Sequence, residues 1–310
     1  MKIYTAEDVL GALTYPDLLD PLARAMIGVS EATATHPPRT AMPINPAGRL
    51  GVMYGALADP PVHGAKILSL FPDAPKHGLS SHQGFVLLFE SELGTPIAAL
   101  NADAVTVLRT AAMSMLATQV LANPDPRTVT ICGAGEQADS HARASLACFP
   151  DAQIRLWARR PDAAETLRDH LNDSRVCVEP DLAEAIRGAD VIHTTTASVE
   201  AFLTGALLEP GQHVNLVGAS LAAWREIDDE GVARVTMFTD SLESSSRESG
   251  EIIDAKAAGV IGADYPVTEI GTVLQKKTPG RVSAEQITAY KSHGLIVQDL
   301  MAAAVLCGLV

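Results

Sequence analysis

Cysteines are scarce in this sequence, and their positions argue against two kinds of cysteine chemistry. The 310 residues include four cysteines, whose spacing matches no metal-binding motif: Cys132, Cys148, Cys177 and Cys307. We expect no disulfide framework and no metal site, and we interpret the four as reduced, small apolar residues. Aromatic residues are also few, at 4%, so a core drawn from the 47% of hydrophobic residues must consist mainly of Ala, Val, Leu and Ile.

Positive charges are outnumbered by negative ones. The 23 Lys and Arg residues against 37 Asp and Glu residues give a net charge of −14. Nucleic acids and anionic membrane surfaces require a basic face, so neither is an expected partner, whereas a small anionic substrate responds to local charge. The sequence shows no signal peptide and no uncharged apolar run of transmembrane length, so we expect a cytoplasmic protein without a membrane span.

One motif stands out among the features that are present. The β-branched run Thr128–Cys132 leads into a glycine-rich turn, and a helical pattern follows it. Gly133 allows a tight turn, Gly135 lets the backbone approach a pyrophosphate, and Ala138 lets the helix pack closely on the strand. The pattern predicts a dinucleotide-binding loop at a helix N-terminus, with a purely structural turn as the alternative. The residues assigned to this loop are Gly133, Gly135, Glu136, Gln137 and Ala138.

The segment around this motif alternates strands and helices. Predicted strands lie at 128–132, 154–158, 176–179, 191–195 and 213–217, and predicted helices at 137–147, 162–171 and 181–186. This alternation is typical of an α/β fold with a Rossmann-type, doubly wound parallel sheet.

A different pattern flanks this segment on both sides. Apolar residues at helical spacing predict two helices within 6–35, and short apolar runs between 39 and 102 predict an antiparallel sheet. Residues 104–121 predict one helix. Residues 283–308 predict two more, and the last of them, over 297–306, could return to the N-terminal region.

The end of the second predicted strand bears on the choice of dinucleotide. NAD-specific folds usually carry Asp or Glu there, whereas this chain has Ala158 followed by Arg159 and Arg160. Guanidinium groups pair with a 2′-phosphate that a carboxylate would repel. The pattern favours NADPH, with NADH as the alternative cofactor and a solvated basic turn as the structural alternative.

Three cations and two histidines are candidates for chemistry. Arg39 lies on a proline-bounded segment, while Lys66 and Arg109 lie within apolar runs. A buried cation needs an anionic partner, either an internal carboxylate or a ligand, and three together favour a carboxylate-binding pocket. Burial near other cations also lowers the pKa of a lysine toward the range of proton transfer. His82 and His293 are candidates for proton transfer or substrate binding, or simply bond to backbone.

Taken together, several segments resemble the ornithine cyclodeaminase/μ-crystallin family, in order along almost the whole chain. These segments are Arg39-Thr40, the Lys66 strand, Ser81-His-Gln83, Leu108-Arg-Thr-Ala-Ala112, Gly133 to Ala138 with His141, Gly188-Ala-Asp190, Pro210 to Asn215, Val217-Gly-Ala-Ser220, Trp224-Arg-Glu226 and Tyr290 to Gly294. The resemblance implies a split α+β domain, over 1–118 and 292–310, for substrate binding and homodimer formation. It implies an inserted dinucleotide-binding domain over 119–291.

The resemblance also implies roles for individual residues. Arg39, Lys66 and Arg109 match positions that hold the α-carboxylate of the substrate and assist proton transfer. Besides the glycine-rich loop and the two arginines, the residues assigned to the cofactor are Thr110, Thr195, Val217 and Gly218.

One position departs from the ornithine cyclodeaminases. Ser220 stands where those enzymes carry an Asp that acts on the δ-amino group, and a serine holds no negative charge near neutral pH. The surrounding pattern is similar to the ketimine reductase branch, which reduces C=N bonds next to a carboxylate with NAD(P)H. We therefore predict reduction of an α-imino acid, such as 1-pyrroline-2-carboxylate, to the L-amino acid, with Ser220 or His293 near the nitrogen.

Other activities stay open at this point. The substrate could be acyclic, such as iminosuccinate, with His82 and His293 binding a second carboxylate, or the protein could be an amino-acid dehydrogenase. An ornithine cyclodeaminase ranks below these because of Ser220. A μ-crystallin-like binding protein without catalysis also ranks below them, because Lys66, Arg109 and the fingerprint are all present.

Overall fold

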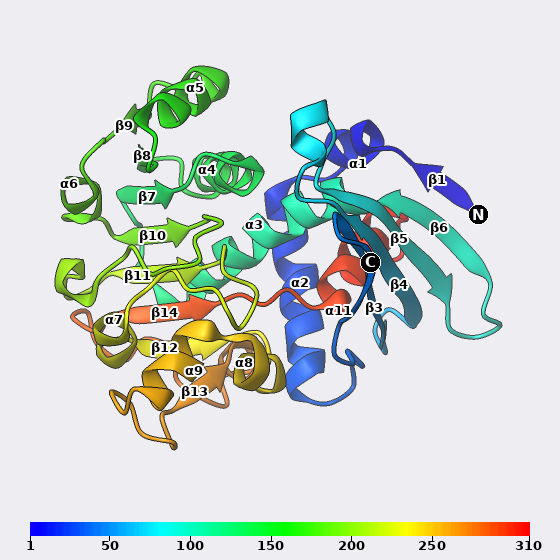
Figure 1. The fold of residues 1–310 in the computed structure, drawn as a ribbon. Coiled ribbons are helices and arrows are strands. Elements are labelled where there is room, and N and C mark those ends of the chain that lie inside the picture. The colour runs from blue at the N-terminus through cyan, green and yellow to red at the C-terminus, as the bar shows by residue number, and fades with distance from the viewer. The chain divides into compact units, whose positions relative to one another are not determined.

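The chain forms two compact units, which are described separately. A computed structural model describes the backbone of residues 1–310 and every side chain except that of Pro75. The split unit consists of Met1–Ala112 and Gly294–Val310, and the inserted unit consists of Met113–His293. Figure 1 shows the two chain segments of the split unit, blue to cyan and red, in one body.

A six-stranded sheet forms the centre of the split unit. Its order is β1-β6-β5-β4-β3-β2, antiparallel except that β1 pairs with β6 in parallel. The strands are β1 (Lys2–Tyr4), β2 (Thr40–Asn45), β3 (Gly48–Leu57), β4 (Val62–Leu70), β5 (His82–Glu90) and β6 (Pro96–Asn101). The predicted antiparallel sheet is confirmed, whereas β1 and β2 were not predicted, because three residues and a proline-containing run carry too little periodic signal.

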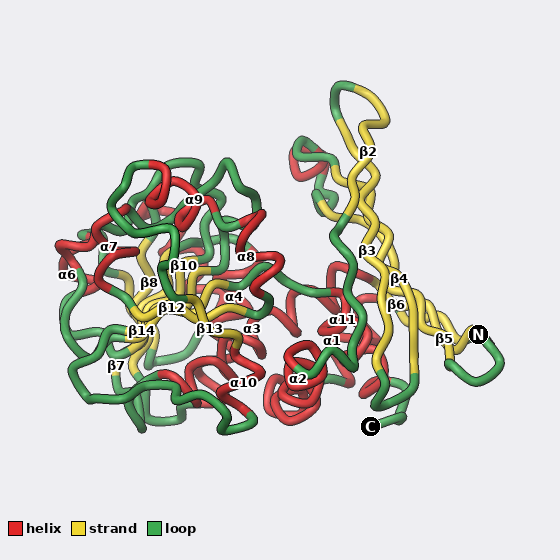
Figure 2. The backbone as a smooth tube through the Cα atoms, turned by 90° about the horizontal axis from the view of Figure 1, so that it is seen from below, coloured by secondary structure: helices red, strands yellow, loops and turns green.

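Helices cover one face of this sheet, as Figure 2 shows. The helices of the split unit are α1 (Ala6–Ala12), α2 (Tyr15–Ser30), the first part of α3 (Ala102–Leu121), α11 (Ile296–Leu306) and a 3₁₀ turn at Ala74–His77. Thr5 and Asp8 form a capping box that starts α1, and Thr14 caps α2. As predicted, α11 returns from the end of the chain, and it packs on α2 and on β3, β4 and β5.

Strand alternation gives the two sheet faces different characters. Lys66 lies opposite Met53 and Val86, and it is only 2% exposed on the helix-covered face. Its neighbour Ile67 points the other way and lies in line with Phe85 on the uncovered face. The register therefore places a charged side chain inside and apolar ones outside.

The inserted unit contains an eight-stranded parallel sheet, which confirms the predicted Rossmann-type class. Its order is β13-β12-β14-β11-β10-β7-β8-β9. The strands are β7 (Thr128–Cys132), β8 (Gln153–Trp157), β9 (Val176–Val178), β10 (Val191–Thr194), β11 (His213–Leu216), β12 (Thr236–Thr239), β13 (Val267–Glu269) and β14 (Thr288–Lys291). The helices are α4 (Glu136–Cys148), α5 (Pro161–Leu171), α6 (Leu182–Ile186), α7 (Asp229–Arg234), α8 (Leu242–Glu248), α9 (Gly250–Ala257) and α10 (Ile270–Leu274), with a 3₁₀ turn at Gly205–Leu207.

Both faces of this sheet are buried. Val191 and Ile192 are consecutive on β10 and fully buried, yet they belong to separate apolar clusters on opposite faces. The long helix α3 has the length and composition of a membrane span, but 78% of that stretch is buried inside the structure, as core helices commonly are.

One predicted helix is wrong. The first of the two helices expected within 283–308 is absent from this part of the described chain, where β14 instead lies between β11 and β12. Its four residues are all buried, so the strand carries no alternation between apolar and polar residues that the sequence could reveal.

Candidate functional site

The fingerprint turn connects β7 to α4 in a conformation that only glycine adopts easily. Gly133 has φ +142°, and a Cβ atom there would lie 2.6 Å from Thr195 Oγ1. The Gly133 amide donates a 2.8 Å hydrogen bond to the Trp157 carbonyl, and Thr195 Oγ1 donates to the Cys132 carbonyl at 3.0 Å. The ends of β7, β8 and β10 are therefore tied together around this turn.

The N-terminus of α4 fits an anionic group. The helix begins at Glu136 after Gly135, and no side chain caps its first amides. A Cβ atom at Gly135 would meet nothing within 4 Å, so the space in front of the helix is open. Ala138 is fully buried against the sheet, as its small size predicts. Uncapped N–H groups facing open space at a helix N-terminus are what a pyrophosphate requires.

Arg159 and Arg160 follow β8 at the same carboxyl edge of the sheet. Both are exposed, and neither side chain forms an ion pair or hydrogen bond with any described residue of the chain. Thr195 follows β10, whereas Val217 and Gly218 follow β11. Strand β10 lies between β7 and β11 and pairs in parallel with both. All these predicted cofactor residues thus lie along one edge, where ligands of open parallel sheets bind.

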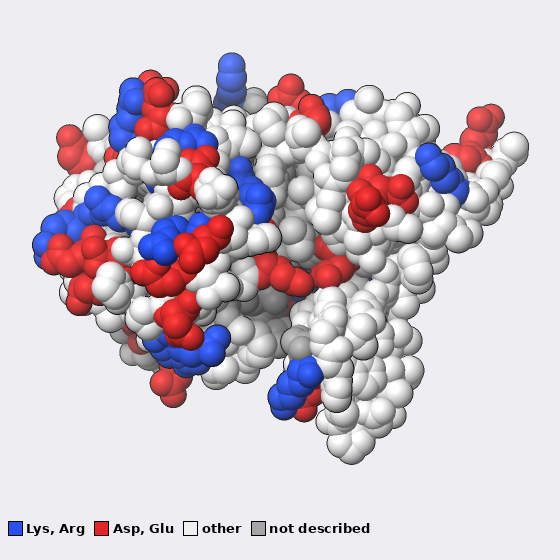
Figure 3. Space-filling model, turned by 90° about the horizontal axis from the view of Figure 1, so that it is seen from above, with Lys and Arg blue, Asp and Glu red and all other residues white. Residues whose placement is uncertain are grey.

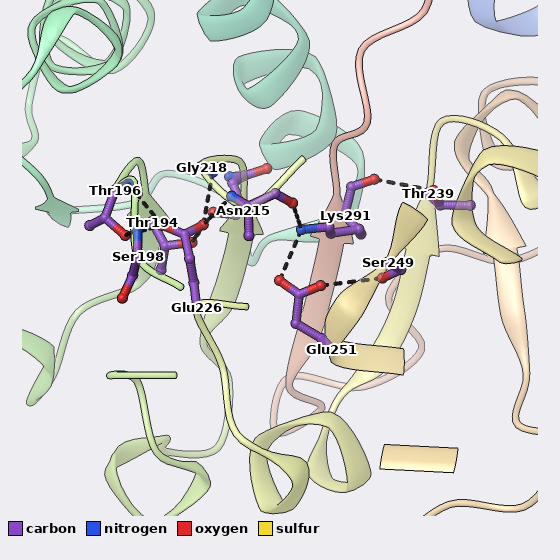
Figure 4. Close-up of polar contacts among 11 residues, drawn as sticks. Thr194, Thr196, Ser198, Asn215, Gly218, Glu226, Thr239, Ser249, Glu251 and Lys291 are labelled. Atoms are coloured by element: carbon purple, nitrogen blue, oxygen red, sulfur yellow. Dashed lines mark hydrogen bonds and ion pairs between the residues drawn. The ribbon is translucent and has the colours of Figure 1, made fainter. Parts of the chain in front are cut away.

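The loop after β11 is held by a buried carboxylate, as Figure 4 shows. Glu226 is fully buried and accepts hydrogen bonds from the amides of Gly218 at 2.8 Å and Thr196 at 2.8 Å. Gly218 has no room for a side chain, because a Cβ atom would lie 2.0 Å from the Thr196 carbonyl oxygen. Ser220 ends this loop half-buried.

A buried ion pair lies on the other side of the same loop. Lys291, at the end of β14, is fully buried and contacts Glu251 Oε1 at 2.9 Å. It also donates to the Ala219 carbonyl. His293 follows β14 and is 3% exposed, and its backbone amide donates to Asp240 Oδ2 at 3.0 Å.

A second polar cluster lies within the split unit. Asp299, on α11, is buried, and its Oδ1 accepts hydrogen bonds from Lys66 Nζ at 3.1 Å and Arg109 Nε at 3.0 Å. Arg109 Nη1 also donates to Gln298 Oε1 at 2.8 Å, which leaves Nη2 without a partner among the described residues. Lys66 Nζ also donates to Thr106 Oγ1, whose own proton goes to the Ala102 carbonyl.

Burial and charge shift the pKa values of this cluster. The pKa of Lys66 is lowered to about 8, mainly by burial; Asp299 opposes this shift, and the charges of Arg109 and Arg39 contribute to it. Burial alone would raise the pKa of Asp299, but Arg109 and Lys66 hold it below its ordinary value. The cluster therefore contains an ionised carboxylate and a lysine that can lose its proton near neutral pH.

The remaining predicted residues of the split unit lie at different distances from this cluster. Arg39 is half-buried before β2 and within electrostatic range of Lys66. Thr110 follows Arg109 on α3, with a buried hydroxyl that has no partner among the described residues. His82, at the start of β5, is exposed as a whole residue, and its Nδ1 contacts Ser81 Oγ; partial desolvation of the ring lowers its pKa, Asp103 opposes this, and Lys66 adds to it.

Several residues of these sites were not predicted: Asp299, Gln298, Glu226, Lys291 and Glu251. Asp299 and Gln298 had a signal in the sequence, since they are polar residues within an otherwise apolar final helix. Glu226 lay inside a motif that carried the resemblance, but no chemistry was assigned to it. Neither spacing nor composition indicates that these side chains reach partners far away in sequence.

The fold and these sites define a Rossmann-type α/β protein with a second unit that carries a buried, cation-rich cluster. The model of the ornithine cyclodeaminase/mu-crystallin family matches residues 1–307, and the chain belongs to this family. The expected family resemblance is thereby confirmed.

Named relatives are similar over nearly the whole chain. Ketimine reductase mu-crystallin of Mus musculus is 35% identical over 305 residues, covering 96% of this chain and 94% of that protein. The structure of Thermococcus litoralis Delta(1)-pyrroline-2-carboxylate reductase with NADH and L-proline matches with a TM-score of 0.92 and 26% identity, covering 100% and 97% of the two chains. The iminosuccinate reductase of Paracoccus denitrificans with NAD⁺ matches with a TM-score of 0.90 and 27% identity, covering 100% and 96%.

Proposed function

We propose that this protein reduces the C=N bond of an α-imino acid with a nicotinamide cofactor and forms the L-amino acid. The observation that carries the proposal is the buried cluster in which Lys66 and Arg109 share the single carboxylate of Asp299. Two buried cations thus share one anion, and a substrate carboxylate would balance the excess. The first substrate proposed is 1-pyrroline-2-carboxylate, because the similar structure from Thermococcus litoralis contains L-proline.

Each residue of the cluster has a separate role in this proposal. Arg109, through Nη2, and Arg39 bind the α-carboxylate, and Lys66 delivers a proton to the imine nitrogen. With a pKa of about 8, Lys66 is mostly protonated at neutral pH, yet it is a stronger acid than an ordinary lysine. Ser220 or His293 provides a hydrogen bond to the nitrogen. The bound nicotinamide supplies a hydride to the imine carbon, so that hydride and proton together convert C=N to CH–NH.

The cofactor we propose is NADPH, with NADH as the alternative. The open N-terminus of α4 suits the pyrophosphate, and the unpaired Arg159 and Arg160 suit a 2′-phosphate. The same proposal assigns cofactor contacts to Thr110, Gly133, Gly135, Glu136, Gln137, Ala138, Thr195, Val217 and Gly218.

The activity is tested by following cofactor oxidation with imino acids formed from keto acids and ammonia or amines. We expect turnover of 1-pyrroline-2-carboxylate, and Arg39→Met should raise KM by roughly ten- to hundredfold, because it removes one charge-assisted carboxylate contact. Cofactor binding without turnover of any imine would contradict the proposal and favour a binding protein.

The choice of cofactor is tested in the same assay. Wild type should prefer NADPH, and Arg159→Asp should lose that preference. A wild-type preference for NADH would refute the choice of NADPH.

Iminosuccinate is the second candidate substrate. The observation that favours it is the similarity to the iminosuccinate reductase of Paracoccus denitrificans, together with His82, whose pKa responds to the charge of Lys66. In this case His82 would bind the second carboxylate. Equal turnover of substrates without that carboxylate, and no effect of His82→Ala, would exclude this candidate.

A homodimer and a cytoplasmic location belong to the same proposal. The uncovered face of the six-stranded sheet exposes apolar side chains on three adjacent strands: Tyr54 on β3, Ile67 on β4 and Phe85 on β5. Figure 3 shows few charged side chains on the part formed by the split unit, in contrast to the mixed charges on the inserted unit. The exposed apolar face of the six-stranded sheet is suited to binding a second copy of the chain. The four cysteines are free thiols, as a reducing compartment would keep them.

A further inference from the structure

Two buried charges of opposite sign hold the loop of residues 217–220 from two sides (Figure 4). Glu226 Oε2 accepts hydrogen bonds from the Gly218 amide at 2.8 Å and the Ala219 amide at 3.3 Å. On the other side, Lys291 Nζ donates to the Ala219 carbonyl. Both backbone groups of Ala219 are thus bound to charged side chains, and Ser220 is the next residue.

Glu226 also joins this loop to the one after β10. Its Oε1 accepts from the Thr196 amide at 2.8 Å and the Thr196 hydroxyl at 2.6 Å, and its Oε2 accepts from the Thr194 hydroxyl at 2.7 Å. Each carboxylate oxygen therefore faces at least one backbone N–H. A glutamine of the same size would turn its NH₂ group toward one of these donors, so only a carboxylate satisfies both sides.

The charges are costly for a loop that needs only to fold. Glu226, Lys291 and Glu251 are all fully buried, and Glu226 forms no ion pair with any described residue. Burial of a charge carries a large desolvation penalty, and apolar residues of similar volume often replace a buried ion pair without loss of stability. What the charges add is a fixed geometry, since charge-assisted hydrogen bonds are short and directional.

We propose that Glu226 and Lys291 are positioning residues that fix Ser220 and the edge between β10 and β11 for imine reduction. They would act through the loop 217–220, without touching substrate or cofactor. This inference rests on the proposed function of Ser220, but the fixing of the loop can be measured without any turnover.

The test compares Glu226→Gln with a matched control, Asp190→Asn. Asp190 also binds two backbone amides, those of Arg127 and Thr128, but at the opposite edge of the sheet. We expect Glu226→Gln to speed amide hydrogen exchange at Gly218 and Ala219 and to lower kcat by roughly ten- to hundredfold, with KM for the imino acid changed far less. Asp190→Asn should leave kcat and the exchange of this loop unchanged. Equal exchange in wild type and Glu226→Gln would overturn the proposal, even for an active enzyme.

A double-mutant cycle with Ser220→Ala shows whether Glu226 acts through Ser220. If it does, Glu226→Gln should lower kcat by a smaller factor once Ser220 is alanine than in wild type, whereas fully additive losses would overturn the proposal. Should Glu226→Gln fail to fold, the double variant Lys291→Met with Glu251→Met removes both charges at once and releases the Ala219 carbonyl. We expect it to fold, with faster exchange in this loop and lower kcat; unchanged values of both would overturn the proposal. A wild type that reduces no imine would refute the proposed function, while the exchange data would still decide the role of the two charges in the loop.

Discussion

A single carboxylate, Asp299, lies between the two buried cations of the split unit. It accepts from Lys66 and Arg109 on the same oxygen, Oδ1, and its other oxygen has no partner among the described residues. Burial lowers the pKa of Lys66, and Asp299 raises it against that effect, so Asp299 contributes to the pH at which the lysine loses its proton.

The pH profile of Asp299→Asn tests this role. If protonated Lys66 is the acid, wild-type kcat/KM should fall as pH rises through about 8, the pKa of Lys66. Removal of the Asp299 charge removes an influence that raises this pKa, so the falling limb should move to lower pH. Lys66→Met should abolish this falling limb of the kcat/KM profile. If the limb lies at the same pH in Asp299→Asn as in wild type, Asp299 does not raise the pKa of Lys66.

Contacts between residues that are far apart in the sequence limit what the sequence can predict. Lys66 and Arg109 were predicted as buried cations because they interrupt apolar runs. Their common partner was not predicted, because Asp299 lies 233 residues after Lys66 and 190 after Arg109. Only the return of α11 to the sheet brings it there.

At the scale of elements, β10, β11 and α4 each carry one buried histidine. His193 on β10 and His213 on β11 are fully buried, as is His141 on α4, whose ring centre lies 5.2 Å from that of His193. Burial lowers the pKa of His141 to about 4 and of His213 to about 3, and it lowers the pKa of His193 as well.

These histidines should make the inserted unit sensitive to acid. A folded-state pKa below the unfolded value of 6.5 means that the unfolded chain binds more protons, so stability is complete above about pH 6.5 and falls below it. His141 alone accounts for a loss of roughly 3 kcal/mol near pH 4. The thermal midpoint of unfolding should therefore be lower at about pH 5 than at about pH 7.5.

A substitution of His193 isolates this effect. Both ring nitrogens of His193 lack a hydrogen-bond partner among the described residues, so His193→Phe removes a titrating group without breaking a bond. We expect a smaller fall of the thermal midpoint on acidification than in wild type. His77→Phe, at an exposed position, serves as the control, and an equal fall in wild type and His193→Phe would contradict the explanation.

The elements themselves were predicted unevenly, for physical reasons. Strand β7 leads into the fingerprint, helices separate β7, β8, β9 and β10, and local pattern was enough to predict β7 to β11. Strand β14 is short, buried on both faces and stabilised by pairing with β11 and β12, which are distant in sequence. Local pattern carries no information about such pairing.

At the scale of the whole molecule, the uncovered sheet face leads to a prediction about assembly. Phe85 is 52% exposed on β5, in line with Ile67 on β4. If this face joins two copies, Phe85→Glu should shift the protein from dimer to monomer in sedimentation velocity, because a desolvated carboxylate opposes association. Leu93→Glu, at an exposed turn of the same unit, should leave the wild-type dimer intact. A wild-type monomer, or a Phe85→Glu dimer, would refute the prediction.

The split arrangement of the chain has a consequence for biosynthesis. The inserted unit, Met113–His293, is one continuous stretch of chain, so all of its strands are synthesised before α11. The split unit, by contrast, waits for its last segment, and until then Lys66 and Arg109 have no Asp299 to balance their charges. A nascent chain therefore carries two cations without their carboxylate partner in an unfinished core, and the cluster around Asp299 is among the last features of the molecule to form.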